Sequence, residues 1–223
     1  MFNEKVKEMI RELDKYKLQD KWVRFEKLSK NKKIDSETFQ DEFIIITNGI
    51  LHVENKKFQI LHFFSNGDII NQQVAKISGE NELRLVCDTD VSLIFIDREY
   101  FLNYATNKPS YMEWLLEETL INNKNLYNEL IKYDLSAEER IVYALQYLCD
   151  KLEIESENGY QQIPKYINKI KMAKYGKISR KQLNEKIILL LDKEVLKEKK
   201  GRFYIKNQHK KTKDFSLVFM LFF

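Results

Sequence analysis

The stretch that decides the fold runs from Tyr166 to Leu196 and reads YINKIKMAKYGKISRKQLNEKIILLLDKEVL. A short helical pattern ends near Tyr175, and Gly176-Lys177-Ile178 makes a tight break. Ser179 opens a second helix, and Gln182 follows three residues later. This is the spacing of a capping box, which satisfies the free N–H groups at a helix start. The two patterns together predict a helix-turn-helix.

The second helix of this stretch has one apolar face and one polar face. The apolar residues recur at helical spacing and are expected to be buried; they are Leu183, Ile187, Ile188 and Leu191. The opposite face is polar and mostly basic, as suits a helix that enters the major groove of DNA. Two β-prone runs around Gly201, between Leu196 and Ile205, then predict a hairpin wing. We therefore expect a winged helix that docks on DNA.

Charge is distributed unevenly along the chain. From residue 165 to residue 213 there are 17 lysines and arginines against 4 acidic residues, whereas the rest of the chain has 21 against 30. The net charge of +4 therefore conceals a basic C-terminal third. This asymmetry favours a polyanionic partner for that third, although a lysine-rich solvated surface would have the same composition.

Cysteine usage and hydropathy favour a reduced, cytoplasmic protein without a membrane segment. Cys87 and Cys149 lie in apolar patterns and belong to no CxxC pair, which argues against disulfides and against a thiolate-held metal. The N-terminal residues are too charged for a signal peptide. No apolar run approaches the roughly 20 residues that a spanning helix needs. We assign no role to the apolar tail, residues 215–223.

Residues 34–96 change to short apolar runs separated by turns. Candidate strands lie at Phe43–Ile46, Ile50–Val53, Phe58–Phe64, Leu83–Cys87 and Val91–Ile96. Asn48-Gly49, between the first two runs, predicts a hairpin. Short strands with no intervening helices favour an antiparallel barrel or roll. One or two amphipathic helices over residues 4–28 are expected to pack on it.

A long helix is predicted after the roll, beginning near Pro109, which fits a first helical turn. Residues along it recur in alternating steps of four and three, as in a heptad seam; they are Met112, Leu116, Thr119, Asn123, Leu126 and Leu130. A polar seam residue such as Asn123 can fix register and oligomeric state. The pattern favours a dimer interface, and the alternative is a helix packed on its own domain.

A further helix is predicted to begin at Ser136, with Glu139 at the capping-box position. Its buried face is expected at Ile141, Ala144, Leu145, Leu148 and Leu152, and a polar loop, Glu155–Gln162, follows. The predicted chain is α+β in class. Its expected domains are residues 1–108 (roll and N-terminal helices), 109–134 (dimerisation helix), 135–207 (winged helix-turn-helix) and 208–223 (tail).

This order of elements resembles the Crp/Fnr family of bacterial transcription regulators. The resemblance covers about residues 20–207 and is carried by Asn48-Gly49, Ser65-Asn66-Gly67-Asp68-Ile69-Ile70, Ser136-Ala137-Glu138-Glu139-Arg140 and Ile178-Ser179-Arg180-Lys181-Gln182-Leu183. It implies a cyclic-nucleotide-binding-like β-roll of jelly-roll type that senses an effector. It also implies a homodimer whose winged helices each read a half-site of a near-palindromic operator. The implied partners are double-stranded DNA, a second copy of the chain and RNA polymerase.

The chain departs from the cyclic-nucleotide-binding members of that family. Those members carry a glutamate for the ribose where this chain has Gln72, and an arginine for the cyclic phosphate where it has Asn81-Glu82-Leu83. A buried phosphate without that cation would be poorly compensated. We therefore expect no control by cyclic AMP and no cofactor. What remains resembles the branch that contains positive regulatory factor A.

DNA contacts are predicted on the second helix and the wing. Family members often present Arg-Glu followed three or four residues later by an arginine. Counting from the turn pairs that arginine with Glu185, whereas counting back from Leu191 pairs it with Lys186, and both remain open. Because arginine and lysine bind guanine edges and glutamine binds adenine, base contacts are predicted at Arg180, Lys181, Gln182 and Lys186. Phosphate contacts are predicted at Lys177, Ser179, Lys199 and Arg202, and Asn184 and Glu185 complete the surface.

No motif in the chain points to catalysis. It has no GxSxG, no phosphate-cradling glycine loop and no HExxH, so we expect no enzyme. Two other readings stay open: a regulator of this fold that acts through protein contacts, and a cupin-like small-molecule-binding protein. The cupin-like alternative, which includes a metal-dependent enzyme with its active site in the barrel, would be decided by metal content, and His52 and His62 make a poor metal-ligand set without neighbouring carboxylates. As haem ligands they are candidates only in principle, since histidines on strands are more often structural.

Overall fold

The computed structural model describes residues 4–35, 41–71 and 83–207 and divides the chain into two compact units. The first unit comprises residues 1–134 and the second residues 135–223. Gln72, Asn81, Glu82 and the apolar tail lie outside the described residues. No described helix is both long enough and apolar enough to cross a membrane.

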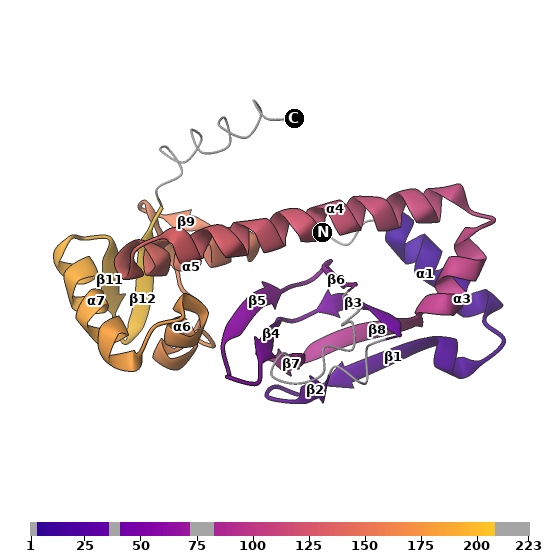
Figure 1. Cartoon of the computed structure of the whole chain (residues 1–223), viewed down its shortest axis with the longest axis horizontal. Helices are drawn as coiled ribbons and strands as arrows, with labels where there is room; N and C mark the ends of the chain where they lie inside the picture. The colour runs from indigo at the N-terminus through magenta and orange to yellow at the C-terminus, as the bar shows by residue number, and fades with distance from the viewer. Residues whose placement is uncertain (1–3, 36–40, 72–82, 208–223) are drawn as a thin grey trace, which may run out of the picture. The chain divides into compact units, whose positions relative to one another are not determined.

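The first unit is built on two four-stranded antiparallel sheets (Figure 1). One sheet has the order β1-β8-β3-β6 and the other the order β2-β7-β4-β5, which is the connectivity of a jelly roll and confirms the predicted fold class. The strands are β1 Val23–Leu28, β2 Lys33–Asp35, β3 Glu42–Asn48, β4 Leu51–Asn55, β5 Ile60–Phe64, β6 Ile69–Ile70, β7 Leu83–Cys87 and β8 Val91–Asp97.

The sheet that holds β3 and β8 is buried on both faces, which explains its continuous apolar sequences. Ile44 and Ile46 point into the core between the sheets together with Leu93. The alternate residues, among them Phe43 and Ile45, lie in a second core on the outer face. Successive strand residues point to opposite faces. An unbroken run such as Phe43–Ile46 is therefore what a doubly covered strand requires.

Helices cover the outer face of this sheet and one side of the roll (Figure 1). They are α1 Glu4–Tyr16, α3 Arg98–Ala105 and α4 Pro109–Ile131, and two short 3-10 turns, η1 Asp20–Trp22 and η2 Lys132–Asp134, join them to their neighbours. Asp97 caps α3 by accepting a hydrogen bond from the backbone N–H of Tyr100. Only the first of the two helices considered over residues 4–28 forms. Residues 23–28 instead pair with β8 as an edge strand.

The predicted hairpin at Asn48-Gly49 is wrong. Strand β3 pairs with β6 and β8, whereas β4 pairs with β5 and β7, so the chain crosses from one sheet to the other at this turn. A Cβ atom on Gly49, whose φ is +93°, would lie 2.3 Å from the backbone oxygen of Asp90. Because glycine has no side chain, Gly49 allows two backbone segments to approach each other closely at the corner of the roll.

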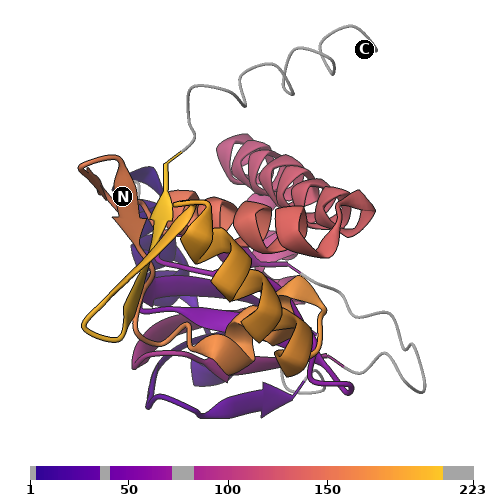
Figure 2. The same ribbon diagram turned by 90° about the vertical axis from the view of Figure 1, so that its left-hand side faces the viewer.

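The second unit combines three helices with a small antiparallel sheet (Figure 2). Its elements are α5 Ala137–Lys151, β9 Ser156–Glu157, β10 Tyr160–Gln162, α6 Lys169–Gly176, α7 Arg180–Asp192, β11 Leu196–Lys199 and β12 Arg202–Lys206, and the sheet order is β11-β12-β10-β9. The capping box predicted at Ser136 and Glu139 is confirmed. Residues 155–162, predicted as a loop, supply two of the strands. On α5, Cys149 is buried and Leu152 only partly so.

The corner at Gly49 gives a stability prediction with a matched control. We expect Gly49→Ala to lower the free energy of unfolding by about 2 kcal/mol or more, because the added methyl group strains the backbone and also collides with Asp90. Gly67→Ala is the control, because Gly67 has nearly the same φ, +91°, and open space around it. It should cost only about 1 kcal/mol of backbone strain. Urea unfolding of both variants measures the difference, and equal losses would contradict this account of the corner.

Candidate nucleic-acid interface

The turn between α6 and α7 is fixed by a left-handed residue followed by a capping box. Lys177 adopts φ 50° and ψ 50°, so the break lies within the predicted stretch Gly176-Lys177-Ile178, of which Gly176 still belongs to α6. Ser179 Oγ accepts a hydrogen bond from the N–H of Gln182 (3.1 Å), and Gln182 Oε1 accepts one from the N–H of Ser179 (3.0 Å). The predicted capping box is confirmed, and it sets the direction in which α7 leaves the turn.

The motif at the start of α5 supports this turn from inside the second unit. Arg140 donates to the backbone oxygen of Leu135 (3.0 Å) and to that of Gly176 (3.5 Å). The second contact satisfies a carbonyl at the C-terminal end of α6, where helices leave acceptors unpaired. One arginine thus links the start of α5 to the break in the helix-turn-helix.

Helix α7 is seated by Leu183, Ile187 and Leu190, which are all buried. The prediction that Ile188 and Leu191 lie on this face is wrong. Ile188 is 60% exposed and Leu191 is only partly buried. Residues 187–191 are all apolar, so they cover more than one helical turn, and the spacing could not show which of them face inward.

The burial pattern of α7 favours one of the two ways of counting along this helix. Counting back from Leu190, the residue that is buried near the end of α7, gives the same register as counting forward from the turn. On this count Glu185 would take the position of the second arginine, and this pairing stays a prediction.

The exposed face of α7 is a contiguous set of predicted site residues. Arg180, Lys181, Asn184 and Glu185 are all exposed. Asn184 lies four residues after Arg180 and three after Lys181, and Glu185 lies four after Lys181, which are the spacings of neighbours on a helix surface. Gln182 is exposed as well, but its amide oxygen is committed to the capping box. Figure 2 shows α7 with the wing beside it.

Lys186 lies on a different flank of α7. Its Nζ atom is 3.7 Å from a carboxylate oxygen of Glu138, and the Nζ atom of Lys193 is 2.5 Å from the other oxygen. The hydrogen bond from Lys193 holds the pKa of Glu138 below its usual value. Lys186 therefore faces the start of α5, away from the contiguous face.

The wing adds a second set of cations. Strands β11 and β12 meet at Lys200 and Gly201, both with positive φ, a backbone suited to a two-residue hairpin. Lys199 is exposed beside them, and Arg202 lines a cavity of about 260 Å³ between the wing and the start of α6. Lys165 and Lys169 line the same cavity. Sequence reasoning missed these two lysines because no motif distinguishes them from other surface lysines.

In the first unit, a cavity of about 80 Å³ lies between the roll and α4. Its lining is formed by His62, Phe64, Ile69, Ile70, Asn71, Thr119, Asn122, Asn123, Asn125 and Leu126. Ligand pockets are usually about 300–1,000 Å³, so this space is small. The described lining contains no lysine or arginine; Arg98 bonds to Asn71 (2.7 Å), and Arg84 bonds to Glu54 (2.8 Å).

Both histidines of the roll are buried against carboxylates, contrary to the expectation that they lack acidic neighbours. His52 Nδ1 lies 2.8 Å from Asp88 Oδ2, and His62 Nδ1 lies 3.0 Å from Glu129 Oε1. The other carboxylate oxygen of Glu129 accepts a hydrogen bond from Lys132 Nζ at 2.5 Å. Within the described ranges, no group of three potential metal ligands is present. The two histidines therefore have a structural role, because each contacts a carboxylate inside the first unit.

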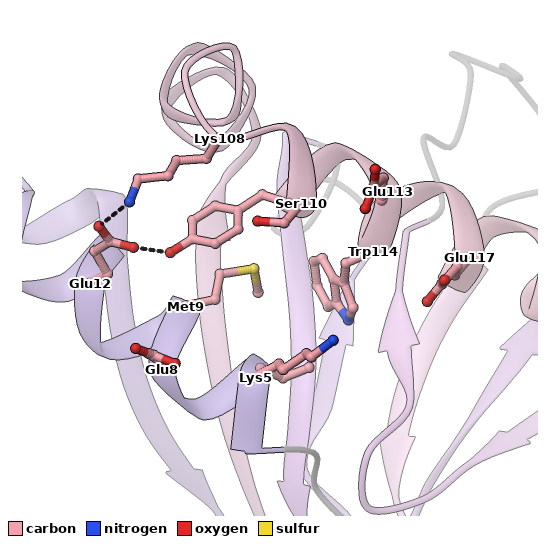
Figure 3. Close-up of a pocket in the computed structure, with 11 residues that line it drawn as sticks. Lys5, Glu8, Met9, Glu12, Lys108, Ser110, Glu113, Trp114 and Glu117 are labelled. Carbon is pink, nitrogen blue, oxygen red and sulfur yellow. Dashed lines mark hydrogen bonds and ion pairs between the residues drawn. The ribbon is translucent and has the colours of Figure 1, made fainter.

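A larger cavity, about 410 Å³, lies between α1 and the start of α4 (Figure 3). Its charged groups are partly engaged with one another, since Glu12 bonds to Lys108 (2.8 Å) and to the hydroxyl of Tyr111. Those bonds lower the pKa of Glu12, with Lys108 as the larger cause. The cavity therefore lies along the contact between α1 and α4, and the bonds of Glu12 hold these two helices together.

Helix α4 carries an exposed apolar stripe on the side away from the roll. Among the predicted seam residues, Met112, Leu116, Leu126 and Leu130 are exposed, and so is Asn123. Thr119 does not belong to the stripe, because it bonds to the backbone of Leu115 (2.8 Å) and to Asn71 (3.4 Å). Leu120 and Tyr127, which the heptad count missed, are exposed instead.

The first unit is a jelly roll followed by a long helix, and the second unit is a winged helix-turn-helix. Comparison with solved structures shows that the fold is that of Crp/Fnr transcription regulators. A cyclic nucleotide-binding domain containing protein from Listeria monocytogenes is 21% identical, with a TM-score of 0.74 over 92% of this chain and 99% of that one. The c-di-GMP responsive global regulator CLP from Xanthomonas campestris is 16% identical, with a TM-score of 0.68 over 91% and 100%.

A putative Crp/Fnr-family regulator from Eubacterium rectale shares the fold as well. It is 10% identical, with a TM-score of 0.64 over 91% of each chain. No protein-family model and no curated protein sequence matched the chain. The likeness therefore lies in three-dimensional structure, and the predicted Crp/Fnr relationship is confirmed at the level of the fold.

The buried Glu129 gives a prediction for stability and its pH dependence. Burial raises the pKa of Glu129, but His62 and Lys132 outweigh burial and leave it below the ordinary 4.5. The carboxylate therefore stabilises the fold above pH 4.5, and this contribution is lost as the pH falls through the lowered folded pKa. We expect Glu129→Gln to cost about 3 kcal/mol at pH 7, because Lys132 would be left buried without its carboxylate.

Urea unfolding at several pH values tests this expectation. Glu117→Gln, an exposed carboxylate on the same helix, is the control and should change stability by less than about 0.5 kcal/mol. The difference between wild type and Glu129→Gln should shrink in acid. A difference that stays constant with pH would contradict the role given to the ionised carboxylate.

Proposed function

We propose that this chain is a sequence-specific DNA-binding transcription regulator of the Crp/Fnr type, acting as a homodimer on a near-palindromic operator. The main observation in support of the proposal is the way in which α7 packs on the second unit. Leu183, Ile187 and Leu190 bury one side of the helix, and the opposite side presents polar, hydrogen-bonding side chains without apolar neighbours at its N-terminal end. A helix presented in this way suits insertion into the major groove.

The basic groups around α7 support the same proposal. Lys177 at the turn and Lys199, Lys200 and Arg202 on the wing flank the helix in the sequence and are accessible in the second unit. Phosphate contacts of this kind position a protein on the duplex, while base contacts specify the site. The regulator works in the cytoplasm and engages RNA polymerase once it is bound to its operator.

The apolar stripe of α4 supports dimerisation. Leu116 and Leu120 are each 61% exposed, and Leu130 is 63% exposed. Apolar stripes of this size on a helix mark an interface with another chain. A second copy is the natural occupant, because Asn123 lies within the stripe, and a polar residue there fixes the register between two identical helices.

The small cavity of the roll supports control without cyclic AMP. Its volume of about 80 Å³ and the uncharged polar groups of its described lining do not suit a cyclic phosphate. The regulator is either competent without a ligand or set by one that is not a cyclic nucleotide, as in the branch that contains positive regulatory factor A. It needs no cofactor or metal. A regulator acting only through protein contacts is disfavoured by the exposed polar face of α7.

Duplex binding is the first test. Fluorescence anisotropy on a randomised duplex pool, with selection of binders and no added effector, should enrich a two-fold-symmetric site. Affinity should fall steeply as salt rises, because lysines and arginines that bind phosphates release counterions from the DNA.

Lys199→Ala should weaken binding to all sequences and lower the slope of log affinity against log salt by about 1. Arg180→Ala should instead cost about 1–3 kcal/mol on the selected site alone. Added cyclic AMP should change neither the affinity for the selected site nor its dependence on salt. Absence of binding at every salt concentration would overturn the proposal.

Dimerisation is tested by placing a charge in the stripe. Leu120→Glu should convert the dimer into a monomer at micromolar concentration, because a carboxylate would be desolvated at the centre of the interface. Glu117→Ala is the control, since Glu117 is exposed on the same helix outside the stripe. Sedimentation equilibrium gives the mass of each. A wild-type monomer, or an unchanged dimer in Leu120→Glu, would show that this stripe is not the interface.

A further inference from the structure

The contiguous face of α7 extends further along the helix than the predicted site. Arg180, Asn184 and Ile188 follow each other at four-residue steps, and Glu185 and Ile188 are three residues apart. Residues at these spacings are neighbours on a helix surface. Ile188 therefore continues the face that Arg180 begins, and it is 60% exposed.

Other apolar or basic residues of α7 lie elsewhere. Lys186 and Lys193 both reach Glu138 and so mark the flank that faces α5. Leu189, which is 41% exposed, follows Lys186 by three residues, precedes Lys193 by four and also follows Glu185 by four. It therefore lies at the edge of that flank, about 100° around the helix from Ile188. Single exposed apolar residues are common. The place of Ile188 on the polar face, rather than its exposure alone, makes it notable.

The chemistry of Ile188 and Glu185 selects particular bases. In the major groove, thymine presents a C5-methyl group, which apolar side chains contact, and cytosine presents an N4 amine, which carboxylates accept from. Isoleucine suits the first task because its branched side chain is stiff. Glu185 has no hydrogen bond or ion pair with any described residue. Facing guanine O6 or thymine O4, its carboxylate would meet another acceptor, so it also rejects wrong bases.

We propose that Glu185 and Ile188 are specificity-determining residues, with Glu185 accepting from a cytosine N4 amine and Ile188 packing on a thymine methyl group in each half-site. This inference rests on the proposed function. Three residues of α-helix rise about 4.5 Å, and base pairs are 3.4 Å apart along the duplex. The two side chains are therefore close enough to contact bases of the same or of neighbouring base pairs.

The thymine methyl group can be removed without touching the protein. Each thymine of the selected site is replaced in turn by deoxyuridine, and the affinity of the full-length wild-type protein is measured by anisotropy. One thymine in each half-site should show a loss of about fourfold, which is the value of one buried methyl group. In Ile188→Ser this penalty should vanish, because the methyl group then has no apolar partner.

Leu189→Ser is the matched control, since it removes a neighbouring exposed apolar side chain from the flank that faces α5. It should keep the full deoxyuridine penalty. Glu185→Gln is tested by repeating the selection, and the cytosine preference at one position should be lost or move to adenine, which glutamine reads. Thermal unfolding verifies that each variant is folded.

The outcomes separate this inference from the function on which it rests. If the wild-type protein selects no symmetric site, the proposed function fails. If it selects one but Ile188→Ser keeps the deoxyuridine penalty, the assignment of Ile188 is overturned while the function stands. An unchanged cytosine preference in Glu185→Gln overturns the assignment of Glu185 in the same way.

Discussion

The burial of one carboxylate, that of Glu129, is the interaction on which the arrangement of the first unit depends. An ionised carboxylate away from water is stable only when charges and donors surround it. Lys132 and His62 meet both needs, at 2.5 and 3.0 Å. Because Glu129 and Lys132 belong to the end of α4 and the η2 turn, and His62 to β5, the contact fixes the rotation of the long helix on the roll. Asn122 adds a hydrogen bond to the backbone of Ile69 (3.1 Å).

That rotation decides which side chains of α4 are left outside. With Glu129, Asn122 and Thr119 turned towards the roll, Leu116, Leu120 and Leu130 are turned away from it. In the second unit, buried side chains likewise fix which face of α7 is exposed. Leu183, Ile187 and Leu190 hold α7 against its neighbours, and the side that remains is polar until Ile188. In both units, a short set of buried groups thus defines an exposed surface suited to binding another molecule.

Sequence reasoning succeeded where the deciding interactions are local. The capping boxes at Ser136 and Ser179 were both predicted, because each depends on residues only three positions apart. It failed where distant strands compete. Asn48-Gly49 has the local chemistry of a hairpin, but β3 and β4 find partners in different sheets. It also failed at residues 187–191, where five apolar residues leave the inward direction undetermined. Neither Glu129 nor Lys132 has a sequence signal, since lysine and glutamate are usually exposed.

The pairing of Glu138 with Lys186 and Lys193 has a consequence for discrimination between DNA sequences. Lysines near a recognition helix attract any duplex, because every sequence has the same phosphates. Under the proposed function, an acidic side chain paired with two of these lysines would lower this indiscriminate attraction and leave the side chains on the exposed face of α7 unchanged. A genome contains an excess of wrong sites, so occupancy of the right one depends on the ratio of the two affinities. In such a regulator, the pairing of Glu138 with Lys186 and Lys193 would raise that ratio by weakening binding to wrong sites, at some cost in absolute affinity.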